Sequence, residues 1–273
     1  MKKLLMASIA LSVLTLAACN NDEEKEKEQL EAIEEIDYTS AASSYKAELM
    51  PILTSFVEDV SLLQSYIQEG KAEEATKLYP LVHMYVERLK PLQGNFTEQF
   101  EKIDAQVVEG KELEASGLHA IEYALFVKKD VKIVIDTASQ LLEDVTALTS
   151  EAATTTLDGK AILSDASTML KDAVEKTLSS DKNNFANSQV YDVQANLEAI
   201  EQVMNAYAAH AEEASEKALQ QQLDKTLEAV AYYEVGKEDY VNYSYFTSKQ
   251  KQDLINAFKV TKEAFDEYIR LMK

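Results

Sequence analysis

His119 and Glu122 are the residues of this sequence whose types and spacing most clearly could do chemistry. They lie three positions apart in the otherwise apolar stretch SGLHAIEYALFVKK at 116–129. Residues at i and i+3 share one face of a helix, so the imidazole and the carboxylate are expected to project together. A carboxylate among aliphatic neighbours is costly to bury without a metal ion, a cationic partner or water. The pair therefore predicts a bound cation, although a helix capped by Ser116 with Glu122 at the solvent rim also accounts for it.

Three further side chains could complete a metal site with this pair. Glu87 and Asp104 lie on the two predicted helices that precede it, and His83 is four residues before Glu87. Taken singly, the two carboxylates also fit solvated helix faces, and His83 fits an ordinary surface histidine. Taken together with an imidazole, several carboxylates suit iron, manganese or zinc rather than Cu(I), because the set contains no thiolate or thioether. We predict metal ligands at His119, Glu122, Glu87 and Asp104, with His83 as an optional addition.

The sequence lacks the short motifs of several enzyme classes. It contains no His-Glu-x-x-His, no Gly-x-Ser-x-Gly, no Walker loop and no dinucleotide-binding glycine cluster. His210 fits an exposed helix position. The tyrosines of 240–246 fit packing at the end of a bundle, although they could also stack on sugar rings. We therefore predict a binding protein without catalytic residues rather than an enzyme.

The first residues have the features of a bacterial lipoprotein leader. Two lysines precede an apolar run from Leu4 to Leu16, and the run ends in Leu-Ala-Ala-Cys, with Cys19 the one cysteine of the chain. We predict a signal peptide over 1–18 and lipidation of Cys19. An ordinary signal peptide followed by an incidental cysteine is the alternative.

Acidic residues outnumber basic ones, 48 to 27, which gives a net charge of −21. Such a surface repels nucleic acid and anionic lipid and attracts cations. A strongly charged run predicts an acidic tether over 19–38 that holds the folded part away from the membrane. No second long apolar span follows, so we expect a protein anchored at the extracytoplasmic face of the cell membrane.

The remaining sequence predicts an all-α fold. Glycine and proline are scarce, at 6 and 3 residues, and apolar residues recur at helical spacing. Four helices, at about 45–67, 72–89, 97–108 and 116–129, predict an N-terminal antiparallel bundle over 39–130 that contains the metal site. Longer helical patterns predict a second bundle over 131–273, interrupted by a tyrosine-rich connection at 236–247. We therefore expect two tandem antiparallel helical bundles.

Several separated segments of the chain follow the order of one known pattern. They are GLHAIE at 117–122 with a following ALF, YPLVHMYVERLKP at 79–91, ID at 103–104, DVQANLE at 192–198 and YVNY at 240–243. These segments resemble the imelysin-like domain of bacterial iron-uptake lipoproteins of the EfeM/EfeO type, whose signature is Gly-x-His-x-x-Glu. The similarity spans nearly all of the chain after the leader.

The resemblance implies an iron-binding lipoprotein, for Fe²⁺ or Fe³⁺, that delivers the ion to a membrane permease. A haem-type peroxidase is the usual third component of such a system. Two departures concern the site: Lys90 stands where the family usually has a glutamate, and His83 stands where it usually has an arginine. The cupredoxin-like domain of longer relatives is missing, which implies the short form.

Two other functions compete with iron uptake. Binding of an acidic polysaccharide is suggested by the tyrosines and by the resemblance, but the net charge of −21 opposes a polyanion unless a metal bridges it. Metallopeptidase activity is suggested by the family's historical link to peptidases, and the missing His-Glu-x-x-His motif opposes it.

Overall fold

The computed structural model describes residues 36–105, 108–180, 184–237 and 239–273. Within these ranges most residues are helical, and a single two-stranded sheet is present, so the all-α prediction is confirmed. Asp37–Lys273 forms one compact unit.

The predicted membrane-targeting features lie almost entirely outside the described residues. This holds for the signal peptide (1–18), for Cys19 and for most of the tether at 19–38. Tyr38, at the end of that segment, is already buried against the folded part. None of the helices described is long and apolar enough to cross a membrane.

The structure describes five α-helices in the N-terminal half. They are α2 (Thr39–Gln68), α3 (Ala72–Leu89), α4 (Thr97–Ile103), α5 (Gly117–Glu122) and α6 (Ile135–Thr154). On α2, a stripe that includes Leu49, Leu53, Phe56 and Val60 is buried, and the helix packs against α3 and α6. This is the i, i+4, i+7 spacing that the sequence predicts.

Three helix boundaries in this half differ from the expectation. The expected first helix begins at 45, but α2 begins at Thr39. The expected third helix reaches 108, but α4 ends at Ile103, and Asp104 has φ −123° and ψ 45°, outside the helical region. The expected fourth helix is α5 followed by a π-helical turn, Tyr123–Lys128, which stops where Lys129 adopts a left-handed φ of 53°. Such π-turns within helices are frequent at functional sites.

Four α-helices and the short sheet lie in the described part of the C-terminal half. The helices are α7 (Gly159–Asp172), α8 (Gln189–Tyr207), α9 (Glu213–Ala231) and α10 (Ser248–Arg270). The strands β1 (Glu234–Gly236) and β2 (Asp239–Tyr240) pair antiparallel in the connection between α9 and α10, where the sequence predicts a tyrosine-rich link.

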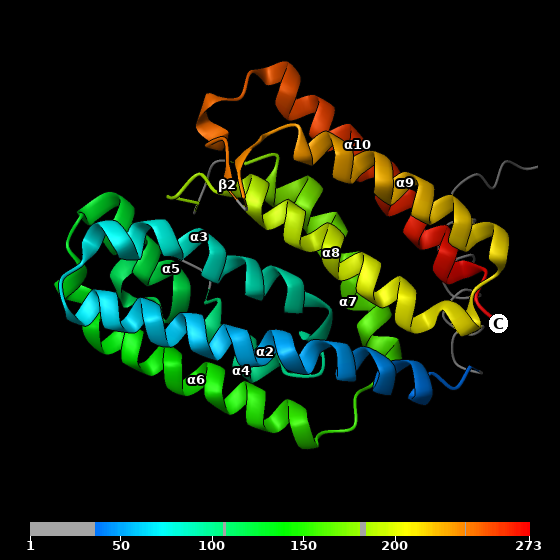
Figure 1. Cartoon of the computed structure of the whole chain (residues 1–273), viewed down its shortest axis with the longest axis horizontal. Helices are drawn as coiled ribbons and strands as arrows, with labels where there is room; N and C mark the ends of the chain where they lie inside the picture. Colours follow the sequence, from blue (N-terminus) through cyan, green and yellow to red (C-terminus); the bar gives the residue numbers. More distant parts are fainter. Residues whose placement is uncertain (1–35, 106–107, 181–183, 238) are drawn as a thin grey trace, which may run out of the picture. The chain divides into compact units, whose positions relative to one another are not determined.

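The helices form two groups that meet along α8 (Figure 1). Helix α6 packs against α2, α4 and α5, whereas α7, α9 and α10 pack against one another or against α8. Helix α8 also packs against α3 and α2, and α7 packs against the 3-10 turn Lys90–Leu92, so both helices join the two groups. The contacts of α6 place it with the helices of the N-terminal half, and a division into two bundles near residue 130 stays a prediction.

Candidate metal centre

Helix α3 turns two polar side chains into the protein interior. His83 and Glu87 are four residues apart, on the face of α3 that packs against α8, and are 5% and 3% exposed. Pro80 lies inside this helix, one turn before His83. The interpretation of His83 as an ordinary surface histidine is therefore wrong, because its ring lies in the core between two helices.

Gly117 brings Asp104 and His119 together. It has φ +69°, and a Cβ atom at this position would lie 2.1 Å from the carbonyl oxygen of Ile103 and 2.5 Å from that of Lys102. Only glycine allows this approach without strain. The start of α5 thus lies directly against the end of α4, and Asp104 is the first residue after that end.

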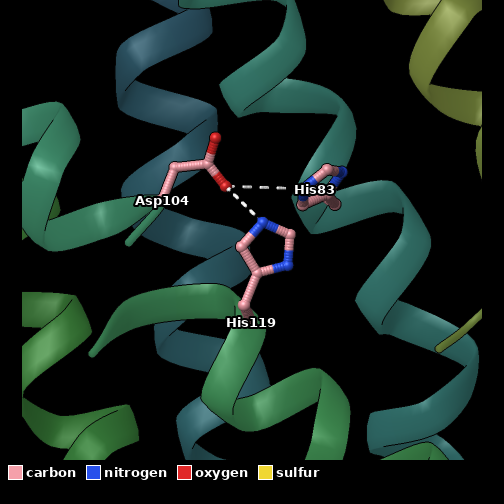
Figure 2. A group of neighbouring side chains, drawn as sticks. All are labelled: His83, Asp104 and His119. Carbon is pink, nitrogen blue, oxygen red and sulfur yellow. Dashed lines mark ion pairs between the residues drawn. The ribbon is translucent and has the colours of Figure 1, made fainter. Parts of the chain in front are cut away.

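One carboxylate oxygen lies between two imidazoles (Figure 2). Asp104 Oδ1 is 3.1 Å from His119 Nε2 and 3.8 Å from His83 Nε2. The centroids of the two imidazole rings are 5.7 Å apart. These three side chains come from α3, from the residue after α4 and from α5, so tertiary packing alone brings them together.

Two atoms of this group lack hydrogen bonds. His83 Nε2 and Asp104 Oδ1 are both buried, and neither makes a hydrogen bond of normal geometry with any residue that the structure describes. Unsatisfied buried polar atoms are rare, and the partner that Asp104 Oδ1 does have is the ion pair with His119 Nε2 at 3.1 Å. A cation bound between His83 Nε2 and Asp104 Oδ1 would give both atoms a direct partner.

The donor set fits a transition-metal ion. Ligand atoms of His83, Asp104 and His119 all lie within 4.8 Å of one another. Nitrogen and oxygen ligands bind such ions at about 2.0–2.2 Å, which places neighbouring ligand atoms roughly 3–3.5 Å apart. Two imidazoles and one carboxylate suit iron, manganese and zinc.

Each imidazole is held from behind by a second carboxylate. Asp192 Oδ1 lies 2.7 Å from His83 Nδ1, and Glu122 Oε2 lies 3.2 Å from His119 Nδ1. These pairings turn both Nε2 atoms toward Asp104. Carboxylate–histidine pairs of this kind fix the tautomer and the orientation of metal-binding histidines.

The sequence predicts Glu122 as a metal ligand, but in the structure its carboxylate lies behind the His119 ring. The i+3 spacing does bring its carboxylate to His119, as expected, but on the side of the ring that faces away from Asp104. Its other oxygen, Oε1, accepts a hydrogen bond of 2.8 Å from the backbone N–H of Ala186. The carboxylate is buried and is satisfied by these two contacts, which suits an orienting role.

Glu87 belongs to a second group, with His83 and Asp192. Its Oε1 lies 2.5 Å from Lys90 Nζ, and its Oε2 accepts a hydrogen bond of 2.7 Å from Asn196 Nδ2. Glu87 and His119 therefore belong to different groups, and only His83 belongs to both. Of the predicted ligands, the structure thus brings Asp104, His119 and His83 together and leaves Glu87 beside them.

The acidic neighbours favour protonated imidazoles when no metal ion is bound. Burial lowers the pKa of His119, but Asp104 and Glu122 outweigh it and raise the pKa to about 9. Burial also opposes a charge on His83, yet Asp192 and Asp104 raise its pKa well above 6.5. Burial would raise the pKa of Asp104, but the two imidazoles hold it well below its usual range. A metal ion must therefore displace protons from this site.

The sequence analysis does not predict Asp192 and Asn196 as site residues. Both are buried polar residues on α8, at 2% and 1% exposure, and they contact His83 and Glu87 across the α3–α8 interface. Their i, i+4 spacing within an apolar helix was the available signal, since two polar residues on a buried face need partners. Sequence alone does not show which helix faces them.

Comparison with known proteins gives the family of the chain. Residues 29–264 match the family model described as "Peptidase_M75: Imelysin". The chain belongs to the imelysin family. The resemblance drawn from separated sequence segments is thereby confirmed.

Two relatives of this imelysin-family chain have informative names. An "Efem/EfeO family lipoprotein" of Staphylococcus haemolyticus (strain JCSC1435) is 26% identical over 275 residues, with 94% of each chain covered. An "Iron uptake system component EfeM" of Pseudomonas syringae pv. syringae (strain B728a) is 22% identical over 199 residues, with 71% of this chain and 70% of the relative covered.

Proposed function

We propose that this protein binds one iron ion between His83, Asp104 and His119 and takes part in iron uptake. The observation that supports this most strongly is the convergence of two buried, unsatisfied atoms, His83 Nε2 and Asp104 Oδ1, with His119 Nε2. Asp192 and Glu122 orient the two imidazoles.

Three protein ligands suit an ion that must be captured and later released. An iron ion usually has more than three ligands, so water or an external ligand fills the remaining positions. Manganese and zinc accept the same donors, and we expect them to compete with iron. Selectivity among these ions then depends on geometry and on their availability.

The names of the relatives support the cellular part of the proposal. One is called a lipoprotein and the other an iron uptake component. Together with the predicted leader and Cys19, they suggest a lipid-anchored protein at the extracytoplasmic face of the membrane. In this proposal it delivers iron to a membrane permease of an Efe-type system, in which a haem-type peroxidase is a further component.

A peptidase activity, which the name of the family model suggests, is not part of the proposal. Metal-dependent hydrolysis needs a base that can take a proton from a metal-bound water. The carboxylates of Asp192, Glu122 and Glu87 are each engaged by a side chain or a backbone N–H. The described residues around the site thus leave no second carboxylate poised beside the ion, and we infer binding rather than catalysis.

Equilibrium dialysis of the purified chain against Fe²⁺, under anaerobic conditions, tests this proposal. We expect one ion per chain and a loss of affinity of about 100-fold or more in His119→Ala and Asp104→Ala, since both remove a ligand. His210→Ala is the matched control. The His210 ring is outside the site and contacts the backbone carbonyl of Lys273. Unchanged affinity in both site variants would overturn the proposal.

A further inference from the structure

We propose that Lys90 decides which of two mutually exclusive positions a metal ion takes around His83. The inference rests on the proposed function, because it concerns where the ion binds. In it, the ammonium of Lys90 takes the place of a cation beside Glu87 and so directs the ion to Asp104 and His119.

Two candidate metal positions share one imidazole. His83 belongs both to the group with Asp104 and His119 and to the group with Glu87 and Asp192. Its Nε2 faces Asp104, and its Nδ1 faces Asp192. The second group is fully buried and contains two carboxylates, which hard cations favour. On ligand chemistry alone, it is at least as good a site as the first.

His83 cannot serve both positions at once. A neutral imidazole has one nitrogen that can bind a metal and one that carries a proton. Binding through both nitrogens would require loss of the second proton as well. An ion at one position therefore excludes an ion at the other.

Lys90 already forms an ion pair with one carboxylate of the second group, that of Glu87. Its Nζ lies 2.5 Å from Glu87 Oε1, and its side chain is mostly buried, at 21% exposure. Asn196 Nδ2 satisfies Glu87 Oε2 at 2.7 Å. Both oxygens of Glu87 thus have partners, and an incoming cation would meet the ammonium at short range, where like charges repel strongly.

The first group shows the opposite pattern. The two unsatisfied buried atoms described above, His83 Nε2 and Asp104 Oδ1, both belong to it. The direct contact of Lys90 is with Glu87 of the second group, whereas its charge reaches Asp104 of the first group only through space. This contrast leads us to assign a selecting role to Lys90.

Replacing Lys90 by methionine removes the charge and keeps a side chain of similar length. In Lys90→Met, Glu87 loses its cationic partner, and the second position becomes available to an ion. The affinity should then depend on Glu87 and depend less on His119. A thioether is a poor ligand for a hard ion, so the new methionine should not bind Fe²⁺ itself.

The test is anaerobic Fe²⁺ binding to the full chain, with Glu87→Gln and His119→Ala made in the wild-type and in the Lys90→Met background. We expect the loss of Fe²⁺ affinity caused by Glu87→Gln to be about 10-fold larger in the Lys90→Met background than in the wild type. The loss of affinity caused by His119→Ala should be about 10-fold smaller in that background. A purely long-range charge effect predicts additive costs in the two backgrounds. Additive costs would overturn the inference.

Two controls separate this inference from its alternatives. Lys77→Met removes an exposed lysine that pairs with Glu73 on the same helix, and we expect it to leave both costs unchanged. Lys90→Arg keeps the positive charge and should keep the wild-type pattern. If Lys90→Met does not fold, as judged by circular dichroism, Lys90→Gln replaces it.

The failure of the proposed function looks different from the failure of this inference. If wild-type protein binds no Fe²⁺, or binds it without dependence on His119, the site itself is wrong. If wild-type binding depends on His119 but Lys90→Met changes neither cost, only the selecting role of Lys90 is wrong.

Discussion

Replacing Gly117 with alanine should both destabilise the protein and damage the metal site. Alanine at φ +69° costs about 1–2 kcal/mol for the left-handed backbone alone. Its Cβ would also lie 2.1 Å from the carbonyl oxygen of Ile103, a backbone atom that cannot move aside cheaply. Overpacking of this kind adds about 1–3 kcal/mol. We therefore expect a loss of about 2–5 kcal/mol in the free energy of unfolding.

Gly70 provides a matched control for this variant. Its φ is +73°, almost the same as at Gly117, but a Cβ there would meet no atom within 4 Å. Gly70→Ala should therefore show only the backbone cost of about 1–2 kcal/mol and leave metal affinity unchanged.

Urea unfolding and anaerobic Fe²⁺ binding measure the two effects. In Gly117→Ala the start of α5 must move away from α4, which separates His119 from Asp104, so affinity should fall by about 10-fold or more. If Gly117→Ala and Gly70→Ala lose the same stability and both retain full affinity, the close approach at Gly117 does not position the site.

Three further predictions concern charge and orientation at the site. Glu122→Gln and Asp192→Asn should each lower Fe²⁺ affinity by about 10- to 100-fold in dialysis, because each imidazole loses the carboxylate that orients it; an effect as large as that of His119→Ala would make Glu122 a direct ligand. Metal affinity should rise with pH up to about 9, because the pKa of His119 is raised to about 9 and the ion must displace its proton. Potentiometric measurement of the protons released on metal binding near pH 7 checks this. An affinity that does not change with pH would contradict it. Without metal, the raised pKa of His119 stabilises the fold fully below about 6.5, and this contribution, on the order of a few kcal/mol, should disappear as the pH rises through about 9, as urea unfolding at several pH values would show. The lowered pKa of Asp104 acts in the opposite sense, so stability should also fall as the pH drops below about 4.

Most of the helices and one contact of the site could be predicted from the sequence. The apolar periodicity placed a helix at 72–89, which matches α3 to the residue, because burial of one face repeats every 3.6 residues. The i+3 spacing placed Glu122 beside His119, since that neighbourhood is local to one helix. The family also followed from the sequence, through segments that keep their order along the chain.

The tertiary structure alone decided the rest of the site. His83 and Asp192 are 109 residues apart in sequence, and only the packing of α3 against α8 brings them to 2.7 Å. The sequence predicts Glu87 beside His119, but Lys90, three residues later in the chain, pairs with one of its oxygens, and the packing of α3 against α8 brings Asn196 to the other. Periodicity tells which face of a helix is buried, but it does not tell which other helix covers that face. For a site built where three or four helices meet, that partner decides whether a buried carboxylate binds the ion, orients a ligand or holds a lysine.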